Sequence, residues 1–164
     1  TTLLKAFDAF KKTSNNDFAL VIVGHKYWGN EEMEETYENM TFQHKVIFTG
    51  HLPQNELIRV VGSAFALVFP SYYEGFGIPI VEAMQSGVPV ICSNATVHPE
   101  IAEDAALYFE PHNVDQLVHQ MVQLQTDQDQ YNSLQSKGLQ RARHFNWDFT
   151  AETIWKTVLK VTAE

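Results

Sequence analysis

Two glutamates lie eight residues apart on either side of a glycine-rich segment. Glu74 is followed directly by Gly75, Phe76 and Gly77, and Glu82 comes shortly afterwards. Carboxylates accept hydrogen bonds from the hydroxyl pairs of a sugar or a ribose. Glycines leave backbone N–H groups open to an anion, above all where a helix begins and its first N–H groups are unpaired. The segment therefore predicts a site for a ligand with an anionic part and polyhydroxyl parts, such as a nucleotide sugar.

The residues around these glutamates predict a strand, a glycine loop, a short helix and a second strand. The apolar run 65–69 ends at Pro70, as a buried strand does. Pro79 suits the first turn of a helix, where its missing N–H group has no partner to lose. Gly87 suits the end of that helix, and the apolar run 89–92 suits the next strand. The alternative is an ordinary turn with solvated carboxylates, since glycine loops that open helices are common.

Strands and helices alternate along the whole chain. Apolar runs predict strands over residues 18–23, 45–48, 65–69, 89–92 and 105–109. Helical spacing predicts helices over residues 2–12, 27–40, 53–62, 99–103, 114–125, 130–144 and 149–161, besides the one between Pro79 and Gly87. Such lengths suit right-handed parallel crossovers. The expected fold class is therefore α/β, a Rossmann-like doubly wound sheet of five or six parallel strands with helices on both faces.

Ligands of such sheets bind at the carboxyl ends of the strands. The loops expected at that edge are residues 24–26, 50–52, 71–77 and 93–98. The central glycine segment lies in the third of these loops, so the candidate site and the expected topology agree.

Composition describes one ordinary domain over residues 1–164, with 45% hydrophobic and 19% charged residues. The net charge of −9 argues against electrostatic binding to nucleic acid or anionic lipid. The single cysteine, Cys92, excludes an internal disulfide and is expected to be buried in its strand. The seven histidines show no ligand spacing, and no apolar run reaches the roughly 18 residues of a membrane span.

Residues 74–83 (EGFGIPIVEA) resemble the E-x7-E motif of the GT-B glycosyltransferases, in particular the retaining family 4 or "group 1" type. Other segments in the same order are also similar to that family's pattern: residues 46–52 (VIFTGHL), 69–71 (FPS), 87–91 (GVPVI), 99–101 (PEI) and 104–107 (DAAL). The resemblance covers nearly the whole chain. It implies the donor-binding half of an enzyme that transfers a sugar from a nucleoside-diphosphate sugar to an acceptor with retention.

The resemblance also assigns roles to individual residues. It implies that Glu74 contacts donor-sugar hydroxyls near the bond that breaks, as the catalytic candidate that positions rather than abstracts a proton. It implies that Glu82 holds the ribose hydroxyls. Gly75, Phe76, Gly77 and Ile78 would bind the donor, the last three through backbone N–H groups that stabilise the leaving diphosphate. The ring of Phe76 is expected to pack under the loop.

The nucleotide base is the expected partner of a second segment. The resemblance implies that Gly50, His51 and Leu52 contact the base, largely through their backbone. His25 and Lys26 face the same edge if the topology is right, but an ordinary turn is an equal alternative.

Parts of the family's pattern do not occur in this chain. The family's arginine and lysine that neutralise the diphosphate precede the first helix, and its N-terminal acceptor domain would also lie before residue 1. We therefore expect an N-terminally truncated domain with little or no activity by itself, and polar final helices that dock on something outside the chain. No metal or cofactor is expected, because helix N-termini and basic residues replace a metal ion.

The resemblance also suggests partners and a location. The implied acceptor is a glycan, a lipid or a small molecule, with no nucleic acid partner. The family works in the cytoplasm or at the inner face of a membrane, with peripheral membrane association of the full-length protein.

Two other functions remain open. One is a non-catalytic domain that binds a nucleotide sugar or a partner protein, against which the intact pair of Glu74 and Glu82 argues. The other is a sugar-nucleotide epimerase on the same fold, for which the spacing of Gly75, Gly77 and Pro79 is less typical. Release of an epimerised sugar nucleotide without an acceptor would favour the epimerase.

Overall fold

The computed structural model describes residues 1–24 and 31–162. Its strands are β1 (Leu20–Val23), β2 (Val46–Gly50), β3 (Leu67–Phe69), β4 (Val90–Ser93) and β5 (Ala106–Phe109). Its α-helices are α1 (Thr2–Thr13), α2 (Glu31–Glu38), α3 (Gln54–Gly62), α4 (Ile78–Gln85), α5 (His98–Ala102), α6 (Val114–Thr126), α7 (Gln128–Ala142) and α8 (Trp147–Thr162). Two 3₁₀ turns are η1 (Gln43–Lys45) and η2 (Glu103–Ala105). The predicted alternation of strands and helices is confirmed.

The strands pair in parallel, but in two groups. β1 pairs with β2, and β3, β4 and β5 form a second sheet in that order. The described strands are thus divided between two hydrogen-bonded groups instead of one, while the predicted α/β class with parallel strands and helices on both faces is confirmed. β3 has only three residues, and the pairing of β1 with β2 shifts its register between Ile22 and Val23.

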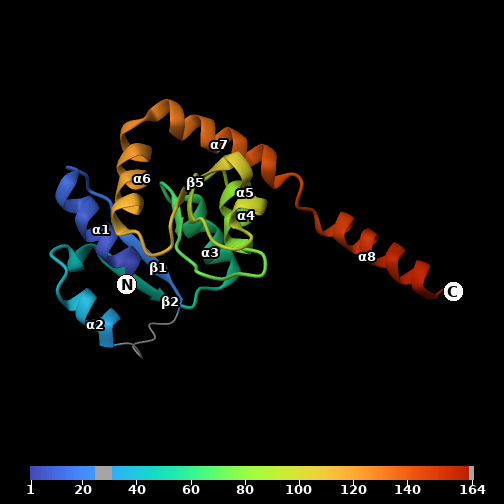
Figure 1. Cartoon of the computed structure of the whole chain (residues 1–164), viewed down its shortest axis with the longest axis horizontal. Helices are drawn as coiled ribbons and strands as arrows, with labels where there is room; N and C mark the ends of the chain where they lie inside the picture. The colour runs from blue at the N-terminus through green and yellow to red at the C-terminus, as the bar shows by residue number, and fades with distance from the viewer. Residues whose placement is uncertain (25–30, 163–164) are drawn as a thin grey trace.

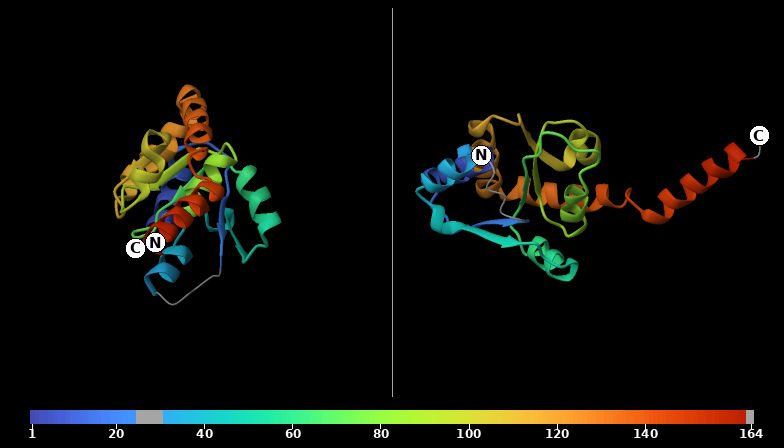
Figure 2. Two further views of the ribbon diagram at one scale, coloured as in Figure 1. Left: turned by 90° about the vertical axis from the view of Figure 1, so that its right-hand side faces the viewer. Right: turned by 90° about the horizontal axis from the view of Figure 1, so that it is seen from below.

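Strand β4 shows why the fold is doubly wound. Ile91 belongs to one hydrophobic core, which α1 and α6 cover with residues such as Phe7 and Leu117. Val90 and Cys92 belong to a second core under α4 and α5. Successive side chains of a strand point to opposite faces, so helices cover both faces of this strand. Figure 1 and Figure 2 show these helices around the central strands.

Helix α4 is bounded by two glycines in the left-handed conformation. Gly77 precedes it with φ +91°, and Gly87 follows it with φ +69°. At the far end, the Val88 N–H donates to the Ala83 carbonyl at 2.9 Å and the Gly87 N–H donates to the Met84 carbonyl at 3.0 Å. This pair of bonds is a Schellman motif, for which glycine is favoured. The predicted order of strand, glycine loop, short helix and strand is confirmed.

The last helix leaves the body of the protein. Every residue of α8 is exposed, and the helix extends away from the remaining elements in Figure 1 and in the right view of Figure 2. Its exposed apolar side chains are Trp147, Phe149, Ile154, Trp155, Val158, Leu159 and Val161. Among the described residues, no helix is both long enough and apolar enough to cross a membrane.

Several predicted helices begin at another residue, and two of these differences bear on the site. The helix predicted over residues 27–40 is seen as α2, which starts at Glu31, while residues 25–30 lie outside the description. The helix predicted from Pro99 starts one residue earlier, at His98. This earlier start places His98 inside the fold, where its side chain is fully buried.

Candidate functional site

The loops that follow β3 and β4 are joined by hydrogen bonds. The Ser93 hydroxyl donates to the backbone carbonyl of Ser71. The Glu74 N–H donates to the Thr96 hydroxyl at 3.3 Å. Since both loops leave the carboxyl ends of neighbouring parallel strands, the structure brings together the segments 71–77 and 93–98 at the expected edge.

The carboxylate of Glu74 is held in place within its own loop. The Ser71 hydroxyl donates a hydrogen bond of 2.9 Å to Oε1 of Glu74. The residue is half-buried, and no other described side chain bonds its carboxylate. The carboxylate is therefore oriented through one oxygen, while the other oxygen can accept a hydroxyl from a ligand.

Gly77 is required by its surroundings, whereas Gly75 is not. A Cβ atom at Gly77 would lie 3.3 Å from Cδ1 of Ile80 and 3.5 Å from Cδ2 of His98, in a left-handed conformation that side chains rarely adopt. A Cβ atom at Gly75 would meet nothing within 4 Å. The second glycine therefore shapes the turn, and the first leaves open space next to Glu74.

Glu82 lies on the accessible side of α4. Its neighbours Val81 and Ala83 are buried, whereas Glu82 is half-buried and has no hydrogen-bonding or ionic partner for its side chain in the described part of the chain. Residues four apart share a helix face, so Glu82 shares its face with Ile78, which is exposed. The helix start and Glu82 are thus accessible along one face.

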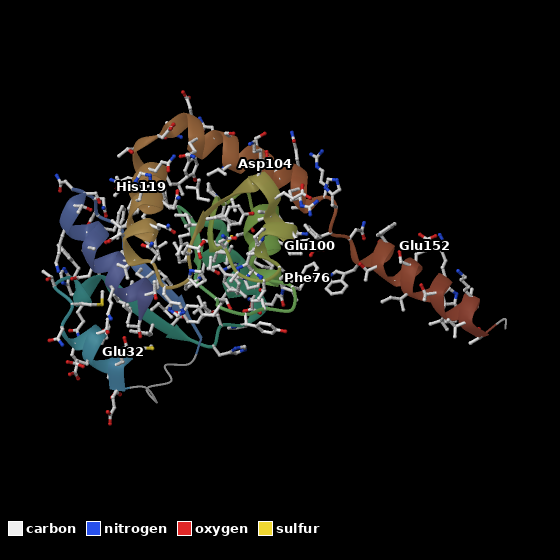
Figure 3. The ribbon with its side chains drawn as sticks, viewed as in Figure 1. Glu32, Phe76, Glu100, Asp104, His119 and Glu152 are labelled. Carbon is white, nitrogen blue, oxygen red and sulfur yellow. The ribbon has the colours of Figure 1, made fainter. Side chains whose placement is uncertain are left out.

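The side chain of Phe76 contacts another aromatic ring. Its ring packs edge-on against Phe145, with centroids 5.6 Å apart, and 44% of the residue remains exposed. Phe145 lies between α7 and α8, so this contact ties the glycine loop to the end of α7 (Figure 3).

The predicted base-binding segment belongs to the other sheet. Gly50 ends β2 with φ +69°, and its carbonyl accepts a 2.9 Å hydrogen bond from the Gly24 N–H. His51 is exposed and Leu52 is half-buried. The segment leads into α3, which packs against α4. His25 and Lys26, predicted at the same edge, lie outside the described residues.

Helix α1 reaches the glycine loop with its first turn. The Thr2 hydroxyl lies 3.2 Å from the Tyr72 hydroxyl. The Tyr72 ring stacks on His112, which follows β5, with centroids 4.4 Å apart. The start of α1 and the loops after β3 and β5 therefore meet at one edge of the molecule.

Sequence reasoning placed loops 71–77 and 93–98 at this edge, but it assigned no role to the side chains that hold the edge together. They are Thr2, Ser71, Tyr72, Ser93, Thr96, His98 and His112. Ser71 and Ser93 do carry a signal, because each is a polar residue at the end of a buried strand. That signal identifies candidates for the edge, but it does not identify their partners.

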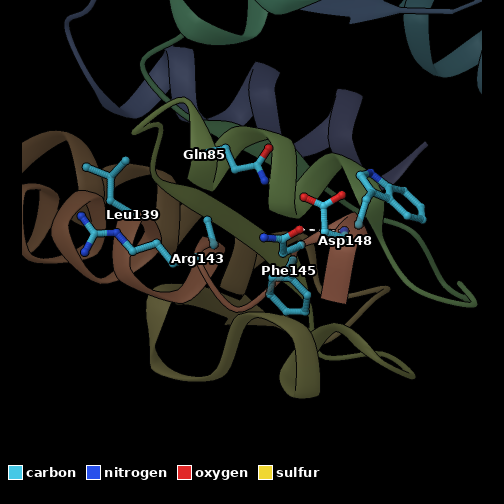
Figure 4. Close-up of a pocket in the computed structure, with 8 residues that line it drawn as sticks. Gln85, Leu139, Arg143, Phe145 and Asp148 are labelled. Atoms are coloured by element: carbon cyan, nitrogen blue, oxygen red, sulfur yellow. Dashed lines mark hydrogen bonds between the residues drawn. The ribbon is translucent and has the colours of Figure 1, made fainter. Parts of the chain in front are cut away.

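Two other features lie outside this edge. A pocket at the junction of α7 and α8 is lined by Gln85, Leu139 and Arg143, among others, and Figure 4 shows it with the 2.8 Å bond from the Asp148 N–H to Asn146. Gln85 ends α4, so this pocket lies at the opposite end of the helix from Gly77. In residues 1–24 and 31–162, no group of three or more His, Cys, Asp or Glu side chains is arranged to hold a metal ion.

The thiol of Cys92 lies directly before Ser93 but faces the core. It is completely buried, as predicted, and burial raises the pKa of the thiol to about 12. A thiol with so little thiolate is a poor nucleophile. Cys92 is therefore a packing residue.

The sequence matches a protein-family model over most of its length. The family model described as glycosyl transferases group 1 matches residues 1–141. The chain belongs to the group 1 glycosyltransferases. Its α/β fold, with parallel strands covered by helices on both faces, is the GT-B type that the sequence predicted.

Relatives within the group 1 glycosyltransferases include bacterial mannosyltransferases. The O-antigen chain mannosyltransferase B of Escherichia coli is 33% identical over 153 residues, 93% of this chain and 40% of that protein. The O-antigen chain mannosyltransferase RfbU of Salmonella typhimurium is 35% identical over 108 residues, 66% of this chain and 31% of that protein. The chain thus spans well under half the length of these relatives.

Solved structures support the fold. Sucrose-phosphate synthase from Thermosynechococcus elongatus superposes with a TM-score of 0.82 at 23% identity, covering 98% of this chain and 42% of that one. Anabaena HepE in complex with UDP-glucose superposes with a TM-score of 0.85 at 19% identity, covering 97% and 44%.

Proposed function

We propose that this chain is the donor-binding half of a retaining glycosyltransferase that uses a nucleoside-diphosphate sugar. The observation that carries the proposal is the hydrogen bond from Ser71 to Glu74 beside the left-handed Gly77. It holds a carboxylate, an acceptor for sugar hydroxyls, immediately before the N-terminal end of α4. That end carries unpaired N–H groups and partial positive charge, which favour a diphosphate.

Each part of the edge has a task in this reaction. The N–H groups of Phe76, Gly77 and Ile78 stabilise the charge that grows on the departing diphosphate as the glycosidic bond lengthens. Glu74 orients the sugar through its hydroxyls, which reduces the entropic part of the barrier. Glu82 binds the ribose, and residues 50–52 contact the base. Gly75 keeps the space beside the carboxylate open.

The remaining parts of the site come from outside this chain. The curated relatives are more than twice as long as the matched region, which supports a second domain that binds the acceptor. The exposed apolar side chains of α8 support a contact between that helix and the rest of the full-length protein. The first turn of α1 lies against Tyr72, so residues preceding Thr1 would enter near the diphosphate. By itself, the chain is expected to be inactive.

The relatives' names suggest which sugar to test first. Several carry the word mannosyltransferase, while structural neighbours were solved with UDP-glucose or with UDP and GlcNAc. Mannose is therefore the first candidate for transfer, to an acceptor that is a glycan, a lipid or a small molecule. The proposed location is the cytoplasm, with the membrane face as the place where a lipid-linked acceptor would be met.

A donor screen with the full-length protein tests the proposal. GDP-mannose, UDP-glucose and UDP-GlcNAc, each α-linked, are incubated with a panel of lipid-linked and free glycans, and products are identified by mass spectrometry. Transfer with an α-linked product by NMR supports a retaining glycosyltransferase, and a β-linked product contradicts retention. Binding without turnover favours a non-catalytic domain, and an epimerised donor released without acceptor favours an epimerase.

A further inference from the structure

His98 is a fully buried histidine beneath the glycine loop. None of its surface is exposed, and its ring packs edge-on against Phe69 with centroids 5.3 Å apart. Cδ2 of the ring would lie 3.5 Å from a Cβ atom at Gly77. The ring therefore fills the space between the end of β3 and the turn that opens α4.

The hydrogen bonds around His98 fix which ring nitrogen carries a proton. Nδ1 lies 3.0 Å from the hydroxyl of Ser93 and 3.0 Å from the carbonyl of Ser93. The one hydroxyl proton of Ser93 is donated to the Ser71 carbonyl. Ser93 therefore offers only acceptors to the ring, and Nδ1–H must be the donor.

The second ring nitrogen takes no part in this arrangement. Nε2 of His98 is buried and has no hydrogen-bond partner among the described residues. If the role of His98 were a polar contact through Nε2, that atom would have a hydrogen-bond partner. The chemistry that this position uses is thus the donor at Nδ1.

The bonds form one continuous series from the core to the candidate site. His98 donates to Ser93, Ser93 donates to the backbone of Ser71, and the Ser71 hydroxyl donates to Glu74 at 2.9 Å. Without the first bond, the Ser93 hydroxyl is free to rotate away from Ser71. Without the second, the backbone that aims the Ser71 hydroxyl at Glu74 loses its tether.

We propose that His98 is a positioning residue for the donor sugar, acting on Glu74 through Ser93 and Ser71. The inference rests on the proposed function, since it assigns Glu74 to the sugar. The inference also distinguishes two parts of one donor, the nucleoside diphosphate and the sugar. The nucleoside diphosphate is bound by the N-terminal end of α4 and by Glu82, to which this series makes no hydrogen bond, whereas the sugar is bound by the carboxylate at its end.

The test compares variants that keep or remove the hydrogen-bond donor at the Nδ1 position, or that remove the next member of the series. His98→Asn places an amide N–H close to the position of Nδ1, whereas His98→Leu retains apolar bulk without a donor. Ser93→Ala removes the next member and leaves His98 in place. Asn94→Ala is the matched control, because the Asn94 side chain bonds Glu110 and not the series.

Calorimetry measures the affinity of the full-length protein for each nucleoside diphosphate and for its sugar form, comparing GDP with GDP-mannose and UDP with UDP-glucose. The kcat is then measured with the donor that the protein accepts. For His98→Leu and Ser93→Ala we expect the affinity added by the sugar, and kcat, to fall about tenfold, since a bond to a charged group is lost or misaligned. Affinity for the bare diphosphate should stay within about twofold, His98→Asn should recover most of the loss, and Asn94→Ala should match wild type.

The outcomes separate this inference from the proposed function. If the wild-type protein binds no sugar nucleotide more tightly than its diphosphate, the proposed function fails, and this inference fails with it. If wild type discriminates but His98→Leu and Ser93→Ala discriminate equally well, only the inference is overturned. Equal losses for diphosphate and sugar nucleotide, or an Asn variant no better than Leu, would make His98 a packing residue. Should His98→Leu not fold, Ser93→Ala gives the same decision.

Discussion

Arg141 of α7 donates a 2.8 Å hydrogen bond from Nε to the backbone carbonyl of Ile101, near the end of α5. Its Nη2 donates to the Glu100 carbonyl at 2.7 Å, and its Nη1 lies 3.0 Å from the Glu103 carboxylate. The last carbonyls of a helix have no partner within it, so one guanidinium caps α5 and joins it to α7. Because α5 begins with His98, this cap holds the helix that carries the positioning residue.

Replacing Arg141 by lysine should destabilise the protein. An ammonium cannot reach two carbonyls and a carboxylate with one fixed fork, so we expect a loss of about 1–3 kcal/mol in the free energy of unfolding. Urea unfolding followed by circular dichroism measures it. Arg143→Lys, an exposed position two residues on, is the control and should change stability by less than about 0.5 kcal/mol. Equal effects at both positions would contradict the cap.

The two glycines of the loop should respond differently to alanine. Gly77→Ala forces a side chain into the left-handed region against Ile80, and should cost about 1–2 kcal/mol of stability. Gly75→Ala has open space and should leave stability unchanged, but it should weaken donor binding, because its methyl group enters the space beside Glu74. Thermal unfolding and calorimetric donor titration of both variants decide this. Tighter or unchanged donor binding by Gly75→Ala would contradict the proposed place of the sugar.

Glu82→Ala in the full-length enzyme should weaken binding of the nucleoside diphosphate and of its sugar form alike. Loss of hydrogen bonds to a carboxylate corresponds to about 1.5–3 kcal/mol, a roughly 10- to 100-fold rise in Kd. Stability should be unaffected, since the side chain has no partner among the described residues. Gln85→Ala, exposed on the same helix, is the control. Unchanged turnover by Glu82→Ala would contradict the assignment of Glu82 to the ribose.

The buried Cys92 thiol should be protected and should give stability a pH dependence. Its pKa is raised to about 12 in the folded protein from 9.0, so unfolding releases its proton once the pH exceeds 9. The contribution of the protonated thiol to the free energy of unfolding is complete below pH 9 and is lost as the pH rises toward 12. Between pH 8 and pH 10 the free energy of unfolding should fall by about 1.4 kcal/mol for this reason.

Cys92→Ala should lack this part of the pH dependence, which unfolding of both proteins at the two pH values would measure. A thiol reagent at pH 8 should react with the wild-type protein only as fast as it unfolds. Rapid labelling of the folded protein would contradict the burial of the thiol.

Local signals predicted most of the fold. Prolines and glycines mark chain reversals so clearly that β1 to β5 all begin within two residues of their predicted starts. β1 begins at Leu20 rather than at the predicted Phe18, whose ring stacks on Phe10 and packs at a tilt against Phe65 instead of joining the ladder. Phe18 is half-buried among these rings, and these tertiary contacts decided its conformation.

The separation into two sheets and the series from His98 to Glu74 could not be predicted in this way. Both depend on which backbone and side-chain groups meet across the fold. Ser71 and Ser93 are 22 residues apart, and no periodicity relates them. The prediction of the loop as a site needed only glycines and carboxylates, whereas its supports required coordinates.

The left-handed glycines at either end of α4 have a consequence for how the sequence of this protein can vary. They set both ends of the helix between Gly77 and Gly87, and so fix the spacing between its N-terminal amide groups and Glu82. One residue inserted between these amide groups and Glu82 would turn Glu82 by about 100° around the helix axis, toward the core. If the proposed function is right, substitutions within this interval can change which donor is bound, but a change in its length would separate the proposed ribose contact from the proposed diphosphate contact.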